Sequence, residues 1–218
     1  MPNPRVSYQT VEFGKIDIHL RTLRDNQEYS DPDGVAERLG ISSAQWSLFG
    51  VVWPAGRVMS HFILDYDTRN KRILEVGCGI GLSSILLNHL RADITATDYH
   101  PEAEAFLNRN TDLNRDQRIP FVRMDWKDTR TTLGKFDLII GSDLLYEDGH
   151  AKLLANFIEL HANQECAVIL VDPGRGNHNK FKKQMALSGF SCERNPVQDS
   201  HNLNDEFSGT ISQYRRSR

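Results

Sequence analysis

Three glycines and one acidic residue have the spacing of a nucleoside-binding unit. The segment 73–98 reads ILEVGCGIGLSSILLNHLRADITATD, and its pattern predicts a strand, a glycine loop, a helix and a second strand. Gly77, Gly79 and Gly81 allow a sharp turn and a close approach of a ligand to the backbone. Asp98 ends the second strand, where a carboxylate can accept hydrogen bonds from ribose hydroxyls. A glycine turn that binds no ligand is the structural alternative.

The details of this loop favour a cationic ligand over a dinucleotide. In dinucleotide-binding loops the third small residue lies on the helix, whereas here Gly81 comes one residue early and Leu82 takes that place. Glu75 precedes the first glycine by two residues. Its carboxylate would repel a pyrophosphate but would attract a positive charge.

The loop E-V-G-C-G-I-G resembles the first motif, E-x-G-x-G-x-G, of the class I S-adenosylmethionine-dependent methyltransferases. The resemblance implies that Glu75 and the loop backbone hold the methionine end of the cofactor and that Asp98 binds both ribose hydroxyls. It also implies that Asp125 or its neighbours meet the adenine amino group and that Trp126 covers the ring, although Trp126 also suits a core or rim position. The predicted cofactor-binding set is Trp53, Glu75, Gly77, Cys78, Gly79, Gly81, Asp98, Tyr99, Asp125, Trp126 and Ser142.

Asp143 and Tyr146 are the candidates for chemistry on the substrate. They lie in the run Gly-Ser-Asp-Leu-Leu-Tyr, which follows a predicted strand at 136–140. A carboxylate can orient an amine through a hydrogen bond, and a tyrosine hydroxyl can bind the same nucleophile. The structural alternatives are a helix N-cap for Asp143, which suits aspartate at a strand-to-helix turn, and ordinary packing for Tyr146.

Together with this D-x-x-Y run, the W-P pair at 53–54 and the D-P-G-R run at 172–175 sharpen the resemblance. The chain is similar to the family 16 methyltransferases, seven-β-strand protein-lysine methyltransferases that act on chaperones, translation factors and a flavoprotein electron carrier. The D-P-G-R run is similar to the branch that modifies the electron-transfer flavoprotein. The resemblance implies that Trp53 lies against the cofactor, although a tryptophan before a helix is also a common core anchor.

Other functions share this fold and cofactor. A small-molecule N-methyltransferase of the nicotinamide or amine type is one alternative, and an RNA methyltransferase or a catalytically silent cofactor-binding module is another. The formal net charge of −3 gives no general attraction to nucleic acid. The chain lacks the N-P-P-Y type of motif that accompanies methylation of adenine or glutamine. A protein lysine is therefore the expected substrate.

The predicted elements that position these residues alternate between strands and helices. This order predicts a Rossmann-like, doubly wound α/β fold with a mostly parallel seven-stranded sheet and helices on both faces. Beyond the strands named above, strands are expected at 121–124 and 167–171, and an antiparallel C-terminal pair at 190–194 and 210–215, joined by a polar connection. The candidate residues follow strand ends, where ligands of such sheets bind.

The length of 218 residues fits one methyltransferase domain, 1–218, in which 53–218 forms the cofactor-binding core. The part before it, 1–52, is expected to hold a β-hairpin within 6–23, a polar loop and a short helix near 35–39, on the substrate side. The three scattered cysteines indicate a reducing, cytoplasmic location. We expect no metal, no membrane segment or signal peptide, and a monomer that binds protein rather than nucleic acid.

Overall fold

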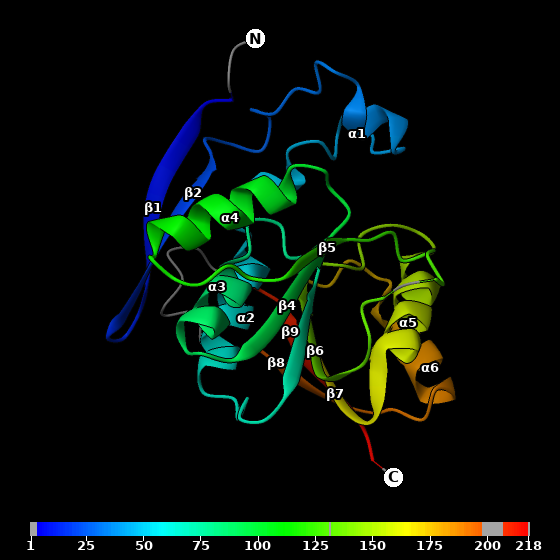
Figure 1. Cartoon of the computed structure of the whole chain (residues 1–218). Helices are drawn as coiled ribbons and strands as arrows, with labels where there is room; N and C mark the ends of the chain where they lie inside the picture. The colour runs from blue at the N-terminus through cyan, green and yellow to red at the C-terminus, as the bar shows by residue number, and fades with distance from the viewer. Residues whose placement is uncertain (1–3, 131, 198–206, 218) are drawn as a thin grey trace.

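The computed structural model describes residues 4–130, 132–197 and 207–217. A seven-stranded sheet runs through its centre in the order β5-β4-β3-β6-β7-β9-β8 (Figure 1). Its strands are β3 Arg72–Val76, β4 Asp93–Asp98, β5 Phe121–Arg123, β6 Phe136–Ser142, β7 Ala162–Asp172, β8 Ser191–Pro196 and β9 Thr210–Arg216. β3 to β7 are parallel, whereas β9 pairs antiparallel with both β7 and β8. The predicted fold class is confirmed.

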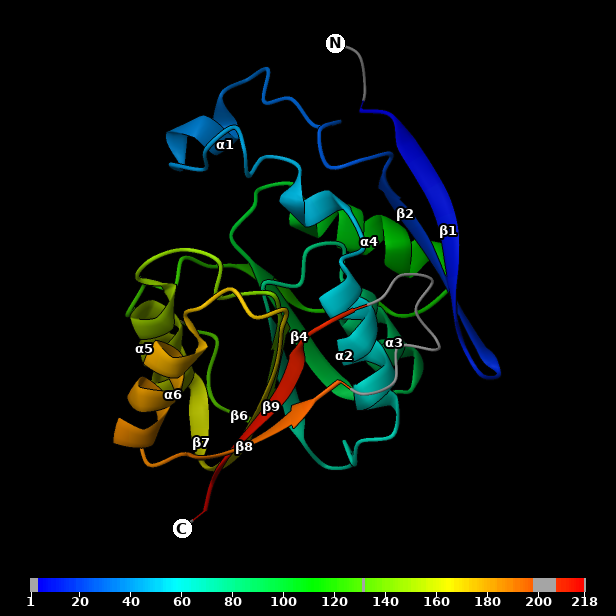
Figure 2. The same cartoon turned by 180° about the vertical axis from the view of Figure 1, so that it is seen from behind.

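Helices cover both faces of the sheet (Figures 1 and 2). They are α2 Pro54–Leu64, α3 Leu82–His89, α4 Ala103–Leu113, α5 His150–His161 and α6 His178–Leu187. Successive side chains of a strand point to opposite faces, so Ile73 packs in the cluster with α2 and α3 while Leu74 packs with α5 and α6. β7 divides in the same way, with Ile169 in the first cluster and Leu170 in the second. The two apolar clusters hold the sheet rigid beneath its strand ends.

The predicted N-terminal hairpin is confirmed as β1 Val6–Phe13 and β2 Ile16–Leu23, and it lies against α4 (Figure 1). Asn110 of α4 and Asn114 at its C-cap bind the edge of β2 that does not pair with β1. Asn110 Oδ1 accepts from the Arg21 backbone N at 2.7 Å, and Asn114 Oδ1 accepts from the His19 backbone N at 2.8 Å. These bonds satisfy edge groups of a two-stranded sheet and fix the hairpin to the core.

Two elements begin three or more residues before their predicted starts. β7 begins at Ala162, five residues before the predicted start at 167, and its register with β6 shifts between the pairs Phe136–Ala162 and Leu138–Ala167. The polar stretch 163–165 within this irregular part hides the strand pattern. The apolar pattern predicts a helix over 181–187, whereas α6 begins at His178, because its first turn is polar. The short helix near 35–39 is confirmed as α1 Val35–Arg38. The predicted polar connection before β9 falls largely on 198–206, outside the described residues.

Candidate active site

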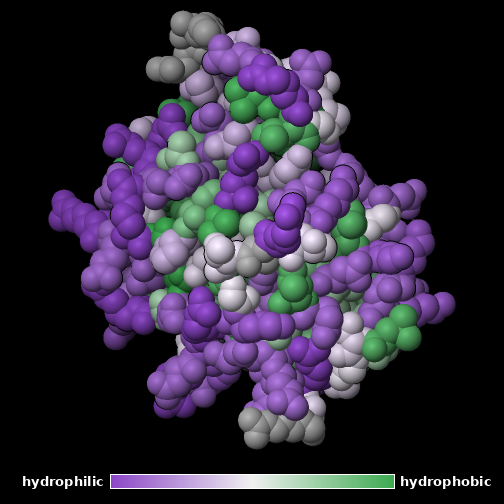
Figure 3. Space-filling model, turned by 45° about the vertical axis from the view of Figure 1, so that its right-hand side comes forward, coloured by the Kyte–Doolittle hydropathy of each residue, from purple (hydrophilic) through white to green (hydrophobic). Residues whose placement is uncertain are grey.

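A cavity of about 620 Å³ lies at the carboxyl ends of β3 to β6, a size typical of small-molecule sites. On the face shown in Figure 3, hydrophobic surface gathers near the middle and hydrophilic side chains surround it. Every residue of the predicted cofactor and substrate sets lines this cavity except Gly81. The lining members of those sets are Trp53, Glu75, Gly77, Cys78, Gly79, Asp98, Tyr99, Asp125, Trp126, Ser142, Asp143 and Tyr146.

Gly81 is required by the backbone conformation of the loop and does not line the cavity. It is the N-cap of α3 with φ 81°, and a Cβ there would stand 2.2 Å from Cδ1 of Leu107 on α4. Gly79, with φ 56°, would place a Cβ 2.9 Å from the backbone oxygen of Phe49. Both positions need glycine for the left-handed backbone and for close packing. Packing within the protein is therefore sufficient to exclude a Cβ from these two positions.

Two successive backbone N–H groups of the loop bond within the protein. The Cys78 N–H donates to the Thr97 carbonyl oxygen at 2.9 Å, and the Gly79 N–H donates to Asp98 Oδ2 at 2.8 Å. A phosphate-binding loop instead directs free N–H groups at its anion. This arrangement argues against a pyrophosphate ligand, in agreement with the sequence.

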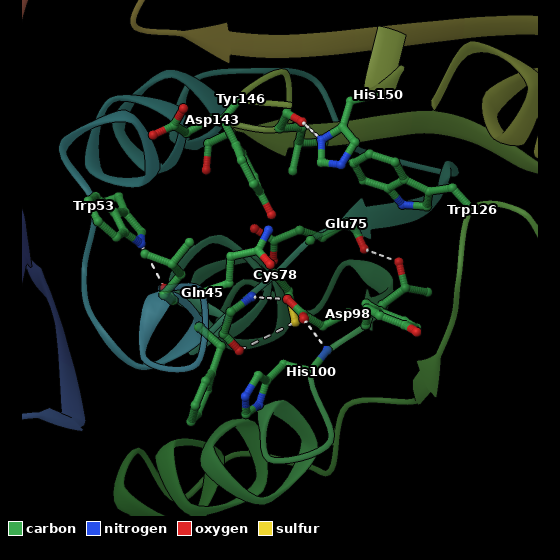
Figure 4. Close-up of a pocket in the computed structure, with 18 of the residues that line it drawn as sticks. Gln45, Trp53, Glu75, Cys78, Asp98, His100, Trp126, Asp143, Tyr146 and His150 are labelled. Atoms are coloured by element: carbon green, nitrogen blue, oxygen red, sulfur yellow. Dashed lines mark hydrogen bonds between the residues drawn. The ribbon is translucent and has the colours of Figure 1, made fainter. Parts of the chain in front are cut away.

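Asp98 joins the glycine loop to the strand that follows it. Its Oδ2 accepts from Gly79, and its Oδ1 accepts from the His100 backbone N–H at 2.8 Å (Figure 4). Burial raises the pKa of this carboxyl. Each carboxylate oxygen has two acceptor sites, so the side chain keeps acceptor capacity for ligand hydroxyls while the protein fixes its orientation.

Glu75 lies at the floor of the cavity with only 4% of its surface exposed. Its Oε2 accepts from the Ser84 backbone N–H at 2.9 Å and from the Ser84 hydroxyl, in the first turn of α3. The carboxylate therefore satisfies a helix N-terminus, where negative charge is favoured. Burial nevertheless raises its pKa to about 7, so a cationic ligand beside it would favour its charged form.

Glu75 is expected to make the folded protein less stable as the pH rises from 4.5 to about 7. Glu75→Gln should abolish this pH dependence. The pKa of Glu75 rises from its ordinary value of 4.5 to about 7 on folding, so the folded protein binds a proton that the unfolded chain releases. Stability therefore falls as pH rises through this window. Thermal melting of the ligand-free protein measures it: the melting temperature of the variant relative to wild type should rise from pH 4.5 to 7.

The comparison between the two proteins cancels the other titrating groups. Among these is His100, whose pKa burial lowers to about 4 and which therefore changes stability in the opposite direction. A difference in melting temperature that stays constant with pH would show that Glu75 does not titrate there.

Aromatic side chains form the walls of the cavity. Figure 4 shows Trp53 and Trp126 at opposite sides, with the ring of Tyr146 directed into the interior. The Trp53 indole N–H donates to the Leu48 backbone oxygen at 2.8 Å. Trp126 and Tyr146 both contact the His150 ring edge to face, with centroids 5.1 and 4.9 Å away. The Tyr146 hydroxyl bonds to no other residue in the described part of the chain, and burial raises its pKa to about 12.

Asp143 is held by a partner that the sequence analysis did not identify. Its two oxygens accept from Arg175, Oδ1 from Nε at 2.5 Å and Oδ2 from a terminal guanidinium nitrogen at 2.7 Å. Asp143 caps no helix, because α5 begins at His150 after Gly149. The N-cap alternative is thereby excluded. The D-P-G-R run was the available signal for Arg175, but no local pattern connects it with Asp143.

The N-terminal segment, which the sequence predicts to lie on the substrate side, completes the cavity through contacts that no local pattern predicts. Gln45 donates to Glu147 after β6, and the Tyr99 hydroxyl donates to the Leu39 backbone oxygen. Phe49, in the 3-10 helix η1 Leu48–Gly50, stacks on His100 with ring centroids 3.9 Å apart. Residues 39–53 thus lie along one side of the cavity and contact the residues after β4 and β6.

Comparison with known proteins assigns this cavity to a family. Residues 38–187 match the family model described as "Lysine methyltransferase". This chain belongs to the lysine methyltransferase family. The matched range includes the glycine loop, Asp98 and the Asp143–Tyr146 run.

Two curated proteins illustrate where this family member stands. It is 28% identical over 174 residues to the electron transfer flavoprotein beta subunit lysine methyltransferase of Rattus norvegicus, covering 74% of this chain and 64% of that protein. It is 29% identical over 138 residues to the protein N-lysine methyltransferase METTL21A of Danio rerio, covering 59% of this chain and 63% of that protein. The chain thus spans slightly less than two thirds of the length of these relatives.

The fold also matches solved methyltransferase structures. One is the magnesium protoporphyrin IX methyltransferase of Synechocystis PCC 6803 with bound SAM, with a TM-score of 0.57, 18% identity, and coverage of 73% of this chain and 76% of that one. Across the described residues, no group of histidine, cysteine, aspartate or glutamate side chains is arranged to hold a metal ion. No helix in that part of the chain is long and apolar enough to cross a bilayer.

Proposed function

We propose that this chain is an S-adenosylmethionine-dependent N-methyltransferase that modifies a lysine side chain of a protein. The observation that carries the proposal is one cavity with two chemically different parts. The glycine loop, Glu75 and Asp98 form one part, and Tyr146 with the Asp143–Arg175 pair forms the other. Membership of the lysine methyltransferase family and the printed functions of the two curated relatives support the same activity.

The residues of the cavity fit the proposed cofactor. Five carboxylates line it, Glu75, Asp98, Asp125, Asp143 and Glu147, against two permanent cations, Lys127 and Arg175. This excess of negative charge suits a ligand with a sulfonium and an α-amino group. Glu75 and the loop would hold the methionine end, Asp98 the ribose hydroxyls, and Asp125 with Trp126 the adenine. When bound, S-adenosylmethionine supplies an electrophilic methyl group on a cationic sulfur.

The protein's own residues then orient the nucleophile and control its charge. A lysine amine titrates near pH 10.4 in water, and only the neutral amine has the lone pair needed to accept a methyl group. Asp143 can orient the incoming amine by accepting its N–H. The Tyr146 hydroxyl remains protonated at neutral pH because its pKa is about 12. It can hydrogen-bond to the lysine nitrogen, and the ring can line the path of the lysine side chain. Alignment of this kind is the main contribution a protein makes to such a displacement.

The rim of the cavity supports a macromolecular substrate over a small one. Tyr146 is 43% exposed and the Arg175 side chain 45% exposed, although both line the cavity. The substrate side is thus open to solvent, and a side chain on a large partner can enter it.

We also propose a cytoplasmic location, because all three cysteines are free thiols.

S-adenosylhomocysteine is expected to raise the melting temperature of the protein, and NAD is expected to leave it unchanged. A ligand that binds only the native state stabilises that state by mass action. The Glu75 carboxylate and the internally bonded loop N–H groups disfavour a pyrophosphate. Differential scanning fluorimetry with each ligand at equal concentration measures both effects. Stabilisation by NAD and none by S-adenosylhomocysteine would overturn the assignment of the cofactor.

The substrate class is tested by incubating the protein with tritiated S-adenosylmethionine and a cell lysate. Protein, RNA and small-molecule fractions are counted separately, and Asp98→Asn serves as the cofactor-binding control. We expect label in protein, recovered as methyl-lysine after acid hydrolysis. Label confined to RNA or to small molecules would instead support one of the alternative methyltransferase functions.

A further inference from the structure

Asp143 is a fixed anion inside the cavity. Its backbone N–H donates to the Val171 oxygen at 2.8 Å, which anchors the end of β6 to β7. Its φ of 52° is left-handed, a conformation that aspartate tolerates better than most residues. The side chain is only 13% exposed. The position of this carboxylate is therefore set by the sheet.

Arg175 is by contrast a cation whose side chain extends from a turn between two glycines. Gly174 and Gly176 flank it with φ of 90° and 91°, and nothing lies within 4 Å of a Cβ placed at either position. Asp172 Oδ1 holds the backbone of this turn, because it accepts from the Gly174 N–H at 2.6 Å and from the Arg175 N–H at 3.3 Å. The 45% exposed guanidinium is held in the cavity by its two bonds to Asp143.

We propose that Arg175 is a positioning residue that occupies Asp143 until the ammonium group of a substrate lysine displaces it. The inference rests on the proposed function. A lysine that reaches this carboxylate would add a second cation to one anion, beside a cationic cofactor. Asp143 is held by the sheet and its side chain is 13% exposed, whereas the Arg175 side chain is 45% exposed. Arg175 is therefore the group that leaves.

This exchange of Arg175 for a substrate lysine on Asp143 restricts which side chains can be methylated. A neutral side chain, such as an amide or a hydroxyl, cannot replace the charge of the guanidinium on Asp143. Only a side chain that arrives as a cation releases the carboxylate, which then orients that nitrogen. Arg175 would thus keep the Asp143 carboxylate correctly oriented in the free protein and admit lysine in preference to glutamine or serine.

The exchange can be measured by NMR of the arginine Nε–H groups, with no cofactor or methyl acceptor present, so the result does not depend on methyl transfer. Arg175→Lys assigns the Arg175 signal, and Asp143→Asn gives its unpaired position. Titration with n-butylammonium chloride, a mimic of the lysine side chain, should move the Arg175 signal toward that unpaired position. Tetramethylammonium chloride at the same ionic strength is the matched control, because this cation has no N–H donor.

The Tyr146 ring signals report occupation of the cavity independently. Saturation of their shifts by n-butylammonium with an unmoved Arg175 signal would overturn the exchange, as would the absence of any shift in either. Once a methyl-accepting protein is known, Arg175→Gln should lower its KM by about two- to fivefold, the strength of a partly exposed ion pair. A fall in kcat as large as that of Asp143→Asn would instead mean that Arg175 must stay bound.

Discussion

Asp143→Asn is expected to slow methyl transfer at saturating cofactor by about 100-fold or more, equivalent to about 2.7 kcal/mol of transition-state stabilisation. The substitution keeps the size of the side chain but removes its charge. An amide cannot orient an ammonium group or the amine derived from it as a carboxylate does. Asparagine also cannot hold both nitrogens of the Arg175 fork, now at 2.5 and 2.7 Å. Single-turnover methylation of the labelled substrate measures the effect.

Two controls separate catalysis from folding in this experiment. Melting and cofactor affinity should change little, because the glycine loop and Asp98 are untouched and asparagine also tolerates the left-handed backbone at this position. Tyr146→Phe should give a smaller loss in the same assay, since it removes a hydroxyl and keeps the wall of the cavity. A wild-type rate for Asp143→Asn in a normally folded protein would remove Asp143 from the catalytic role.

Asp98→Asn is expected to weaken S-adenosylmethionine binding by about 10- to 150-fold, or about 1.5–3 kcal/mol, the strength of a hydrogen bond to a charged group. In the protein both oxygens of Asp98 accept backbone N–H bonds, from Gly79 and His100. An amide has one oxygen, so its NH2 group would face one of these donors. The substitution therefore disturbs the loop as well as the predicted ribose contact. Isothermal titration calorimetry measures the affinity.

Asp93→Asn is the matched control for this change. Asp93 lies at the opposite end of β4, and its side chain is 67% exposed, with only a long contact of 3.9 Å to Arg72. The Asp93→Asn variant should bind the cofactor as the wild-type protein does. Equal affinities for Asp98→Asn and Asp93→Asn would show that Asp98 does not contact the ribose.

The sequence by itself determined the sheet and the cofactor side of the site. Residues 73–98 contain the strand, the glycine turn, the helix and the acid in one continuous run, and each is encoded by local periodicity or by backbone freedom. Parallel strands place their carboxyl ends at one edge. Residues that follow different strands, such as Asp98, Asp125 and Asp143, were therefore expected together, and all three line the cavity.

Only the tertiary structure decided what these side chains bind. Arg175 reaches Asp143 across 32 residues and Gln45 reaches Glu147 across 102, and Phe49 closes on the glycine loop from the N-terminal segment. Local periodicity carries no information about such partners, because they meet only when β6 lies beside β7 and residues 39–53 pack along the cavity. The sequence could therefore predict Asp143 as a catalytic candidate, but only the assembled sheet brings an arginine into contact with its carboxylate.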